Sequence, residues 1–407
     1  MGVDTRLYWI WLQEAVGRGN PLGTELLKKF GEPWDVYHAD RAALKAAGVK
    51  RKADLKALCD KSLRRANAVL TYTLRCRDWI LTPADSYYPE QLKAIEAPPL
   101  VLYGRGEPPR LQDVPTLTIV GTRYCSSTGI YAAEKLAAVA AAAGITVISG
   151  GAVGIDAAAH RGALRAGGVT VLLMPCSLDV SYPRENAALR QSVVMSGGAL
   201  LTEYAPTANA YKSHFRERNR ILSGLSLATC VVEAPKRSGA LMTANFAREQ
   251  GRDVYGVPGD ISRASCKGSN QLIRSGAAPL CSGLDLLEEF SLRWGNHLNI
   301  EAAQYMEENY KAVRPALKEE QRAPARREAR WEKPQRDTPS AAKECPEYLS
   351  ADAKAVFAVL GETALPVDEL AAKCGMAVPR VMAVLTELEL AGCVRPAAGQ
   401  MYARPKD

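Results

Sequence analysis

Six short apolar runs, rich in β-branched residues, alternate with segments of helical periodicity in the middle of this chain. The runs are TLTIV at 116–120, ITVISG at 145–150, VTVLLMP at 169–175, ALLTEY at 199–204, ATCVVEA at 228–234 and DVYGVPG at 253–259. Each is followed by about 10–15 residues of helical pattern. Nearly continuous apolar strands are typical of a parallel sheet that is covered on both faces. The pattern predicts a doubly wound, mostly parallel α/β domain.

Residues 1–75 differ from this pattern, because they consist of short helical segments broken by glycines. The stretch LKAAGVKRKADLKAL resembles half of a helix-hairpin-helix, with its hairpin from Gly48 to Ala53. Lys50 stands where such a hairpin carries its second glycine, so phosphate binding at this turn and a plain helical cap both remain open. We predict a small helical domain of the SAM or helix-hairpin-helix kind over residues 1–75.

The rest of the chain divides at changes in composition. A connector with turn signals, from Leu81 to Gly106, precedes the alternating region, and we place the α/β domain at residues 81–292. Residues 301–345 become rich in alanine, proline and mixed charge, which predicts a flexible or partly helical linker, and we place this linker at residues 293–346. Residues 347–407 regain helical periodicity and end in a strand-like segment, which is typical of a winged helix.

Two glycine-rich loops follow neighbouring strands of the predicted sheet. The first runs from Gly121 to Gly129, and the second is SGGAVGIDAAAH from Ser149 to His160. Glycines allow the backbone to approach an anion, and a helix N-terminus attracts one. Both loops lie at the carboxyl edge of a parallel sheet, where such sheets bind ligands. A phosphate site and two plain strand-to-helix turns both remain open for these loops.

Neither loop has a common nucleotide-binding fingerprint. The chain contains no GxxxxGK[ST] sequence and no GxGxxG sequence. The second strand ends in Ser149, Gly150 and Gly151 where a dinucleotide ribose needs an acidic residue, and Arg123 replaces a second glycine. A polyanion therefore fits better than NAD. Asp156 is expected to be a helix-start residue rather than a catalyst, and His160 is expected to be structural.

A short basic segment with one aromatic residue follows the fourth strand. Binding of single-stranded nucleic acid needs a positive groove and aromatic faces for the bases. The alternative interpretation places Phe215 in the core and makes Arg218 and Arg220 a solvated helix face. The segment KSHFRERNR supplies Lys212, Phe215, Arg216, Arg218, Asn219 and Arg220.

Composition and charge narrow the class of protein. The chain has 407 residues, a net charge of +8 and 47% hydrophobic residues, which predicts two or three domains with sizeable cores. No apolar stretch reaches the roughly 18 residues of a membrane span and no signal peptide is evident, so we expect a cytoplasmic protein. Ten cysteines without a CxxC pair and four histidines without ligand spacing predict reduced thiols and no metal or other cofactor.

Seven ordered blocks between Leu81 and Leu287 closely resemble the DNA-processing protein A family, also called DprA or Smf. Two residues depart from the family pattern: Val153 replaces a basic residue, and Arg216 replaces a proline. The blocks are IVGTR at 119–123, SGGAVGIDAAAHRGAL at 149–164, YPRENAAL at 182–189, SHFRERNRILSGLS at 213–226, VVEAPKRSGALMTA at 231–244, GRDVYGVPG at 251–259 and GSNQLIRSGA at 268–277.

The resemblance implies an extended Rossmann-like core that binds single-stranded DNA, protects it and loads the RecA recombinase during natural transformation. The protein is therefore not expected to be an enzyme. The family also implies a homodimer through GSNQLIRSGAAPL, where Leu272, Ile273 and Leu280 would supply an apolar patch. On the family's pattern the DNA-binding residues are Gly121, Arg123, Ser149, Gly150, Gly151, Lys212, Phe215, Arg218, Asn219 and Arg220.

Two other functions are weighed against this one. A nucleotide phosphoribohydrolase has a related core, but Thr243 and Ala244 stand where its carboxylate should begin, and Glu249 comes more than a turn later. A duplex-DNA regulator would use the winged helix, but residues 346–407 carry six Lys or Arg against eight Asp or Glu, a net −2. We therefore expect this domain to be dispensable for DNA binding, so that truncation near Leu298 leaves a competent core.

Overall fold

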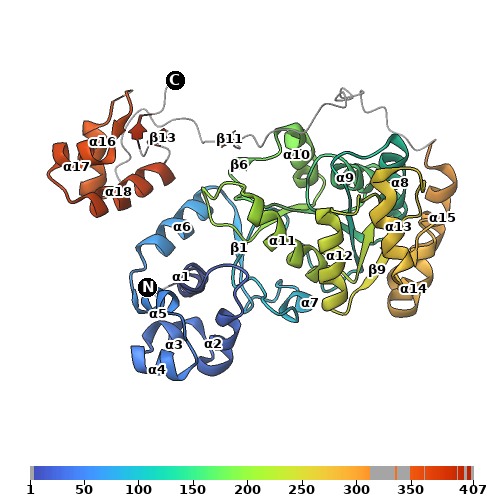
Figure 1. Cartoon of the computed structure of the whole chain (residues 1–407), viewed down its shortest axis with the longest axis horizontal. Helices are drawn as coiled ribbons and strands as arrows, with labels where there is room; N and C mark the ends of the chain where they lie inside the picture. The colour runs from blue at the N-terminus through green and yellow to red at the C-terminus, as the bar shows by residue number, and fades with distance from the viewer. Residues whose placement is uncertain are drawn as a thin grey trace.

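The computed structural model describes residues 4–311, 335–336, 349–361, 363–391, 393–397 and 401–404. Its centre is a nine-stranded sheet with the strand order β1-β2-β7-β5-β4-β3-β8-β9-β10 (Figure 1). Neighbouring strands from β7 to β10 are parallel, whereas β2 pairs antiparallel with both β1 and β7. The predicted doubly wound, mostly parallel α/β sheet is confirmed.

The six predicted apolar runs all form parallel strands. Apart from Asp253 at the start of β9, every residue in these strands is buried, which explains why the runs are almost continuously apolar. The strands are β3 (Thr116–Val120), β4 (Thr146–Ser149), β5 (Thr170–Leu173), β7 (Ala199–Thr202), β8 (Ala228–Val231) and β9 (Asp253–Gly256).

An antiparallel extension of the sheet lies where the sequence predicts a connector. β1 (Trp79–Leu81) pairs with β2 (Leu102–Gly106), and β2 pairs with β7. The Trp79 indole lies across Gly104, where a Cβ would come within 2.1 Å of the ring, and its Nε1 donates to the Gly106 carbonyl at 2.7 Å. Only glycine at position 104 leaves room for this ring.

Helices cover both faces of the sheet (Figure 1). One buried cluster joins α8, α9, α14 and α15 to the sheet, and a second cluster joins α7, α11, α12 and α13 to its other side. The helices are α7 (Glu90–Lys93), α8 (Ser127–Ala142), α9 (Ile155–Arg165), α10 (Ala187–Met195), α11 (Lys212–Gly224), α12 (Gly239–Glu249), α13 (Lys267–Arg274), α14 (Asp285–Trp294) and α15 (Ile300–Asn309), with 3₁₀ turns at Arg184–Asn186, Ala264–Cys266 and Gly295–His297.

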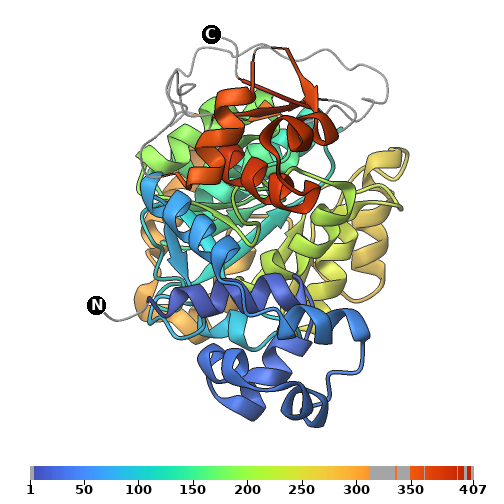
Figure 2. The ribbon, with the colours of Figure 1, turned by 90° about the vertical axis from the view of Figure 1, so that its left-hand side faces the viewer.

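Six short helices precede the sheet, and Figure 2 shows them, in blue, packed beside it. Their buried side chains form one hydrophobic cluster with residues of β2, β5 and β7, including Tyr103, Leu172 and Leu200. The helical region therefore shares its core with the α/β domain. The helices are α1 (Arg6–Val16), α2 (Leu22–Phe30), α3 (Pro33–His38), α4 (Arg41–Ala46), α5 (Lys52–Cys59) and α6 (Arg64–Arg75), with Gly48 at φ +99° in the turn between α4 and α5.

The first part of the predicted linker is helical, as one of the two expectations allowed, and it packs on the core of the α/β domain. Helix α15 packs on α8 through Ala303 and Met306, which are 0% and 7% exposed. The Tyr310 hydroxyl donates to Glu134 at 3.0 Å and contacts Arg165. Truncation near Leu298 would remove this helix from the core. Of the remaining linker, only Gln335–Arg336 (β11) is described, and it pairs with β6 (Val180–Ser181).

The C-terminal segment has the element order of a winged helix, as predicted. Its apolar stripe, Val381, Val384, Leu385 and Leu388, is buried in the domain's own core. The elements are α16 (Ala351–Val359), β12 (Leu365–Pro366), α17 (Val367–Cys374), α18 (Val378–Leu390), β13 (Arg395–Ala397) and β14 (Met401–Ala403), with the strand order β12-β14-β13.

The far edge of the sheet ends at β10 (Ala278–Pro279). Two residues of the apolar patch predicted beside it are not on the surface, because Leu272 and Leu280 are 6% and 1% exposed within their own domain, whereas Ile273 is half-buried. Within the described residues, no helix is both long and apolar enough to cross a membrane. No disulfide joins the nine cysteines in the described part of the chain.

Candidate nucleic-acid interface

The two glycine-rich loops meet at the carboxyl edge of the sheet. β3 and β4 are parallel neighbours, so the loops that follow them leave the sheet side by side. Gly154 has φ +86°, and a Cβ there would come within 2.5 Å of the Thr122 carbonyl oxygen. The Ile155 amide donates to this same carbonyl at 3.3 Å. Glycine at position 154 therefore allows the second loop to lie directly against the first.

The N-terminus of α8 already holds a carboxylate from its own chain. Glu233, which follows β8, accepts a hydrogen bond from the Ser126 amide at 3.0 Å and another from the Ser126 hydroxyl. The Ser126 oxygen in turn caps α8 by accepting from the Gly129 amide at 3.0 Å. The first loop is thus a capped turn, and its contribution to an anion site is the exposed side chain of Arg123.

The N-terminus of α9 is arranged in a similar way around Asp156. Its carboxylate is 5% exposed and accepts from the Ala152 amide at 3.3 Å, as expected for a helix-start residue. Burial raises the pKa of this carboxyl, while the nearby charge of Arg218 acts in the opposite direction. The carbonyls of Gly150 and Gly151 accept from Arg218 and Asn186, and the Ser149 hydroxyl donates to Ile119. These predicted residues are buried beneath the surface of the carboxyl edge, and we call them the floor of the site.

Three predicted or neighbouring side chains from separate segments meet above this floor. The Arg123 guanidinium carbon lies 4.8 Å from the centroid of the Phe215 ring. The Tyr182 ring meets Phe215 edge to face, with centroids 5.6 Å apart. Lys212 is exposed in the first turn of α11, one turn before Phe215. The arrangement places two cations beside an aromatic pair at one edge of the sheet.

The second half of the basic segment turns into the protein. Arg218 and Arg220 are 4% and 8% exposed, so neither lies on a solvated helix face. Arg218 donates to the Gly150 carbonyl at 2.8 Å and to the Leu173 carbonyl, and burial lowers its pKa to about 10. Asn219 donates to Gly239 at 3.2 Å. The contacts of Arg218 join α11 to the ends of β4 and β5, and the contact of Asn219 joins it to the start of α12.

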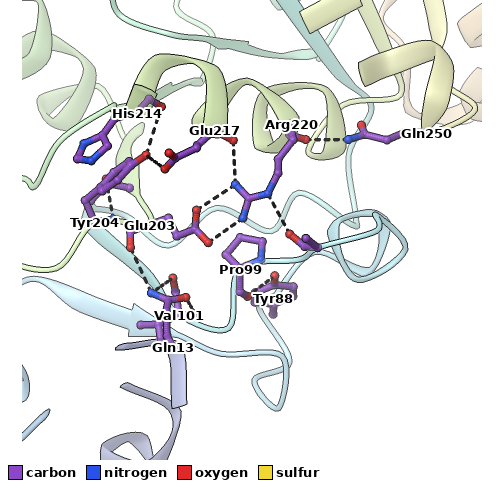
Figure 3. Close-up of polar contacts among 12 residues, drawn as sticks. Gln13, Tyr88, Pro99, Val101, Glu203, Tyr204, His214, Glu217, Arg220 and Gln250 are labelled. Atoms are coloured by element: carbon purple, nitrogen blue, oxygen red, sulfur yellow. Dashed lines mark hydrogen bonds and ion pairs between the residues drawn. The ribbon is translucent and has the colours of Figure 1, made fainter. Parts of the chain in front are cut away.

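Arg220 belongs to a buried polar network that Figure 3 shows. Its guanidinium donates to both oxygens of Glu203 at 3.0 and 2.7 Å, and its Nε donates to the Ala97 carbonyl at 3.0 Å. Gln13 of α1 donates to the Glu203 carbonyl at 3.2 Å and accepts from the Val101 amide at 2.9 Å. The network joins the N-terminal helices to α11. Because the charge of Arg220 is already paired with Glu203, no DNA phosphate is needed to explain it.

Other exposed side chains at the carboxyl edge were not singled out from the sequence. Tyr124, next to Arg123, is 64% exposed, and Tyr211, next to Lys212, is 56% exposed. Lys236 and Arg237 are exposed in the loop after β8, the neighbour of β3. Their position in loops that connect a strand to the next helix is the signal that could have identified them, since all such loops gather at one edge.

The carboxylates expected of a phosphoribohydrolase are not presented at this edge. Thr243 and Ala244 are buried in α12, and Glu249 ends that helix, away from the edge where it begins. Asp156 and Glu233 do lie at the edge, but each accepts hydrogen bonds from its own loops. The site is therefore cationic and aromatic at its surface.

Comparison with known proteins agrees with this architecture. The family model described as DNA recombination-mediator protein A matches residues 79–291, and the DprA winged helix domain matches residues 337–400. Protein Smf of Escherichia coli is 34% identical over 322 residues, which cover 78% of this chain and 76% of that protein. Protein Smf of Synechocystis is 30% identical over 416 residues, covering 99% and 100%.

A solved structure extends the match to three dimensions. The X-ray structure of DNA processing protein A from Streptococcus pneumoniae has a TM-score of 0.62 and 31% sequence identity, covering 71% of this chain and 99% of that chain. The first family model alone covers about half of the sequence, in the same region where the glycine loops and α11 meet. The chain belongs to the DprA/Smf family.

Proposed function

We propose that this protein binds single-stranded DNA along the carboxyl edge of its sheet. The observation that carries the proposal is the meeting of Arg123, Tyr182 and Phe215 from three separate segments, beside the exposed Lys212. Binding without sequence preference combines cations for the phosphates with aromatic faces for the bases. In this arrangement Arg123 and Lys212 contact phosphates and Phe215 supports a base.

The C-terminal domain favours a single strand over a duplex as the ligand. A winged helix that reads a duplex needs several free cations on its recognition helix. In α18 the basic side chain is Arg380, which is paired with Asp352 at 2.6 Å. Glu387 on the same helix adds negative charge, and it accepts from Ser350. Duplex binding by this surface would meet repulsion rather than attraction.

Family membership supports a further step, in which the bound strand is protected and passed to the RecA recombinase in the cytoplasm during natural transformation. The description of the family as a recombination mediator supports this step. Its test is the assembly of RecA on fluorescently labelled single-stranded DNA that a single-strand-binding protein already covers. The protein should shorten the lag before assembly, and an unchanged lag would contradict the loading role.

The binding proposal is tested by fluorescence anisotropy with a labelled single strand and a duplex of equal length. We expect tighter binding to the single strand, with an affinity that falls steeply with salt and barely depends on sequence. Arg123→Ala should weaken binding about tenfold, or about 1.4 kcal/mol. Arg293→Ala is the matched control, because Arg293 is exposed and pairs with Asp253 at the start of β9, the opposite end of the strands. Equal losses in both variants would contradict the placement of the site.

We also propose a homodimer through the far edge of the sheet, around α13 and β10. β10 pairs only with β9 among the described strands, so its outer side is an unpaired edge. Because Leu272 and Leu280 are buried in their own domain, the contact would rest on this edge and on the exposed face of α13. Sedimentation that shows only monomer at tens of micromolar would contradict the dimer.

A further inference from the structure

Tyr211 is an exposed aromatic side chain at the start of the helix that carries the candidate site. It is the N-cap residue of α11, directly before Lys212, and it is 56% exposed. Phe215 follows one turn later on the same helix, where its ring meets Arg123 and Tyr182. The nearest charged neighbours along the chain are basic, since Lys212 and Arg216 are both exposed.

A series of packed rings, His214 and then Tyr204, supports the Tyr211 ring on its inner side. Its ring meets His214 edge to face, with centroids 5.1 Å apart and an interplanar angle of 83°. His214 stacks on the buried Tyr204 ring at 4.1 Å, and the Arg18 guanidinium of the N-terminal region lies 5.0 Å from that ring (Figure 3 shows Tyr204 and His214). The Tyr204 hydroxyl donates to Glu217 at 3.1 Å. The ring therefore rests on a fixed support.

We infer that Tyr211 is a second base-stacking position, which continues the path of a single strand beyond Phe215. The inference rests on the proposed binding of single-stranded DNA and adds a contact that the sequence blocks of the family do not include. Stacking on an aromatic face is sequence-tolerant and contributes substantially for each base. A strand crossing the start of α11 would place one base near Phe215, a phosphate at Lys212 and a further base on Tyr211.

The surroundings of Tyr211 favour a nucleic acid over an apolar protein partner. Ala210, before it, is buried, and Lys212 and Ser213, after it, are exposed and polar. A protein-docking surface usually gathers several apolar side chains into a contiguous patch. A single exposed ring among cations matches the alternation of flat bases and charged phosphates instead.

The test compares a base-bearing oligothymidylate with an abasic strand of the same length, which keeps the phosphates and lacks the bases. Tyr211→Ala should bind the base-bearing strand about tenfold more weakly and the abasic strand within twofold of the unaltered protein. Tyr211→Phe should keep the affinity for both strands. Tyr305→Ala, which removes a 61% exposed ring on α15, is the matched control and should change neither. Lys212→Ala should weaken the binding of both strands, because the base-bearing strand and the abasic strand both retain their phosphates.

The outcomes separate this inference from the function on which it rests. Equal losses on both strands in Tyr211→Ala would show that Tyr211 only supports the helix, and the stacking position would be rejected. If the unaltered protein binds the base-bearing strand and Tyr211→Ala binds it equally well, the stacking position is also rejected. The proposed function then remains intact. If the unaltered protein binds neither strand, the proposed function fails, and the stacking position fails with it.

Discussion

Helix α11 has two halves that look alike in sequence and differ in structure. The outer half, Lys212–Arg216, carries two exposed cations and the Phe215 ring. The inner half, Glu217–Gly224, carries Arg218 and Arg220 at 4% and 8% exposure, hydrogen-bonded to strand ends and to Glu203. The comparison teaches that basic residues can be left exposed to solvent at one end of a helix and be used by the fold at the other.

The largest effect, on the free energy of unfolding, is expected for a substitution in the inner half. Arg220→Met should lower the free energy of unfolding by about 3–5 kcal/mol, because it leaves the Glu203 carboxylate, 2% exposed, without its charge partner. Denaturant unfolding of the full chain measures this. The double variant Arg220→Met with Glu203→Leu should recover most of the loss, since apolar side chains can replace a buried pair. A stable Arg220→Met protein with lost DNA binding would instead assign Arg220 to the site.

The division of α11 explains which part of the site could be predicted. The basic segment after a strand predicted exposed cations at the carboxyl edge, because all loops after parallel strands reach the same edge, and Lys212 and Arg216 are exposed there. Burial of Arg218 and Arg220 could not be predicted from that segment, because their partners lie on other elements: Gly150 and Leu173 after β4 and in β5, and Glu203 after β7. Non-local partners decide whether a cation faces solvent.

The same limit explains the errors in the fold. The parallel strands were predicted because each is buried on both faces and is apolar along its whole length. β2 was missed because its glycines at 104 and 106 signal a turn, whereas the structure uses Gly104 to admit the Trp79 ring. The packing of helix α15 on the core was missed because its buried residues, Ala303 and Met306, are few among charged ones. The overall composition of a segment does not reveal a helix whose apolar face consists of only a few residues.

A titration tests a second buried polar group, which lies on the face of the sheet opposite to α11. His160 of α9 is 0% exposed, its Nδ1 lies 2.7 Å from the Thr170 hydroxyl, and burial lowers its pKa to about 3. A depressed histidine pKa stabilises the fold fully above the unfolded value of about 6.5, and this contribution is lost as pH falls towards 3.

Between pH 6.5 and pH 5 the loss attributable to His160 should reach about 1.6 kcal/mol, because the full slope of about 1.36 kcal/mol for each pH unit applies only below pH 6.5. Unfolding curves of the unaltered protein and of His160→Gln, recorded at both values, isolate this contribution as a difference. The glutamine keeps a polar group near Thr170 and cannot titrate in this range. Parallel pH dependences in the two proteins would show that the histidine is accessible to protons in the folded state.

A smaller effect is expected in the outer half. Lys212→Ala should leave the free energy of unfolding within about 0.5 kcal/mol of the unaltered protein, because Lys212 is exposed. Its affinity for single-stranded DNA should fall about fivefold, or about 1 kcal/mol. The slope of log affinity against log salt should become shallower by about 0.7, the value for one phosphate contact on a single strand. A loss of stability comparable to that of Arg220→Met would remove the distinction between the halves.

The smallest effect is expected from removing the winged helix. The cut belongs after Lys311, because α15 ends at Asn309 and Tyr310 is 3% exposed against the core. Residues 346–407 have a net charge of −2 and Arg380 is paired with Asp352, so the domain offers few cations to phosphates. The outer half of α11 and the loop of Arg123 remain intact in the truncated chain. Single-strand affinity, measured by anisotropy, should therefore change by no more than about twofold, or about 0.4 kcal/mol. A truncated protein that unfolds cooperatively and yet binds DNA tenfold more weakly would place part of the site on the winged helix.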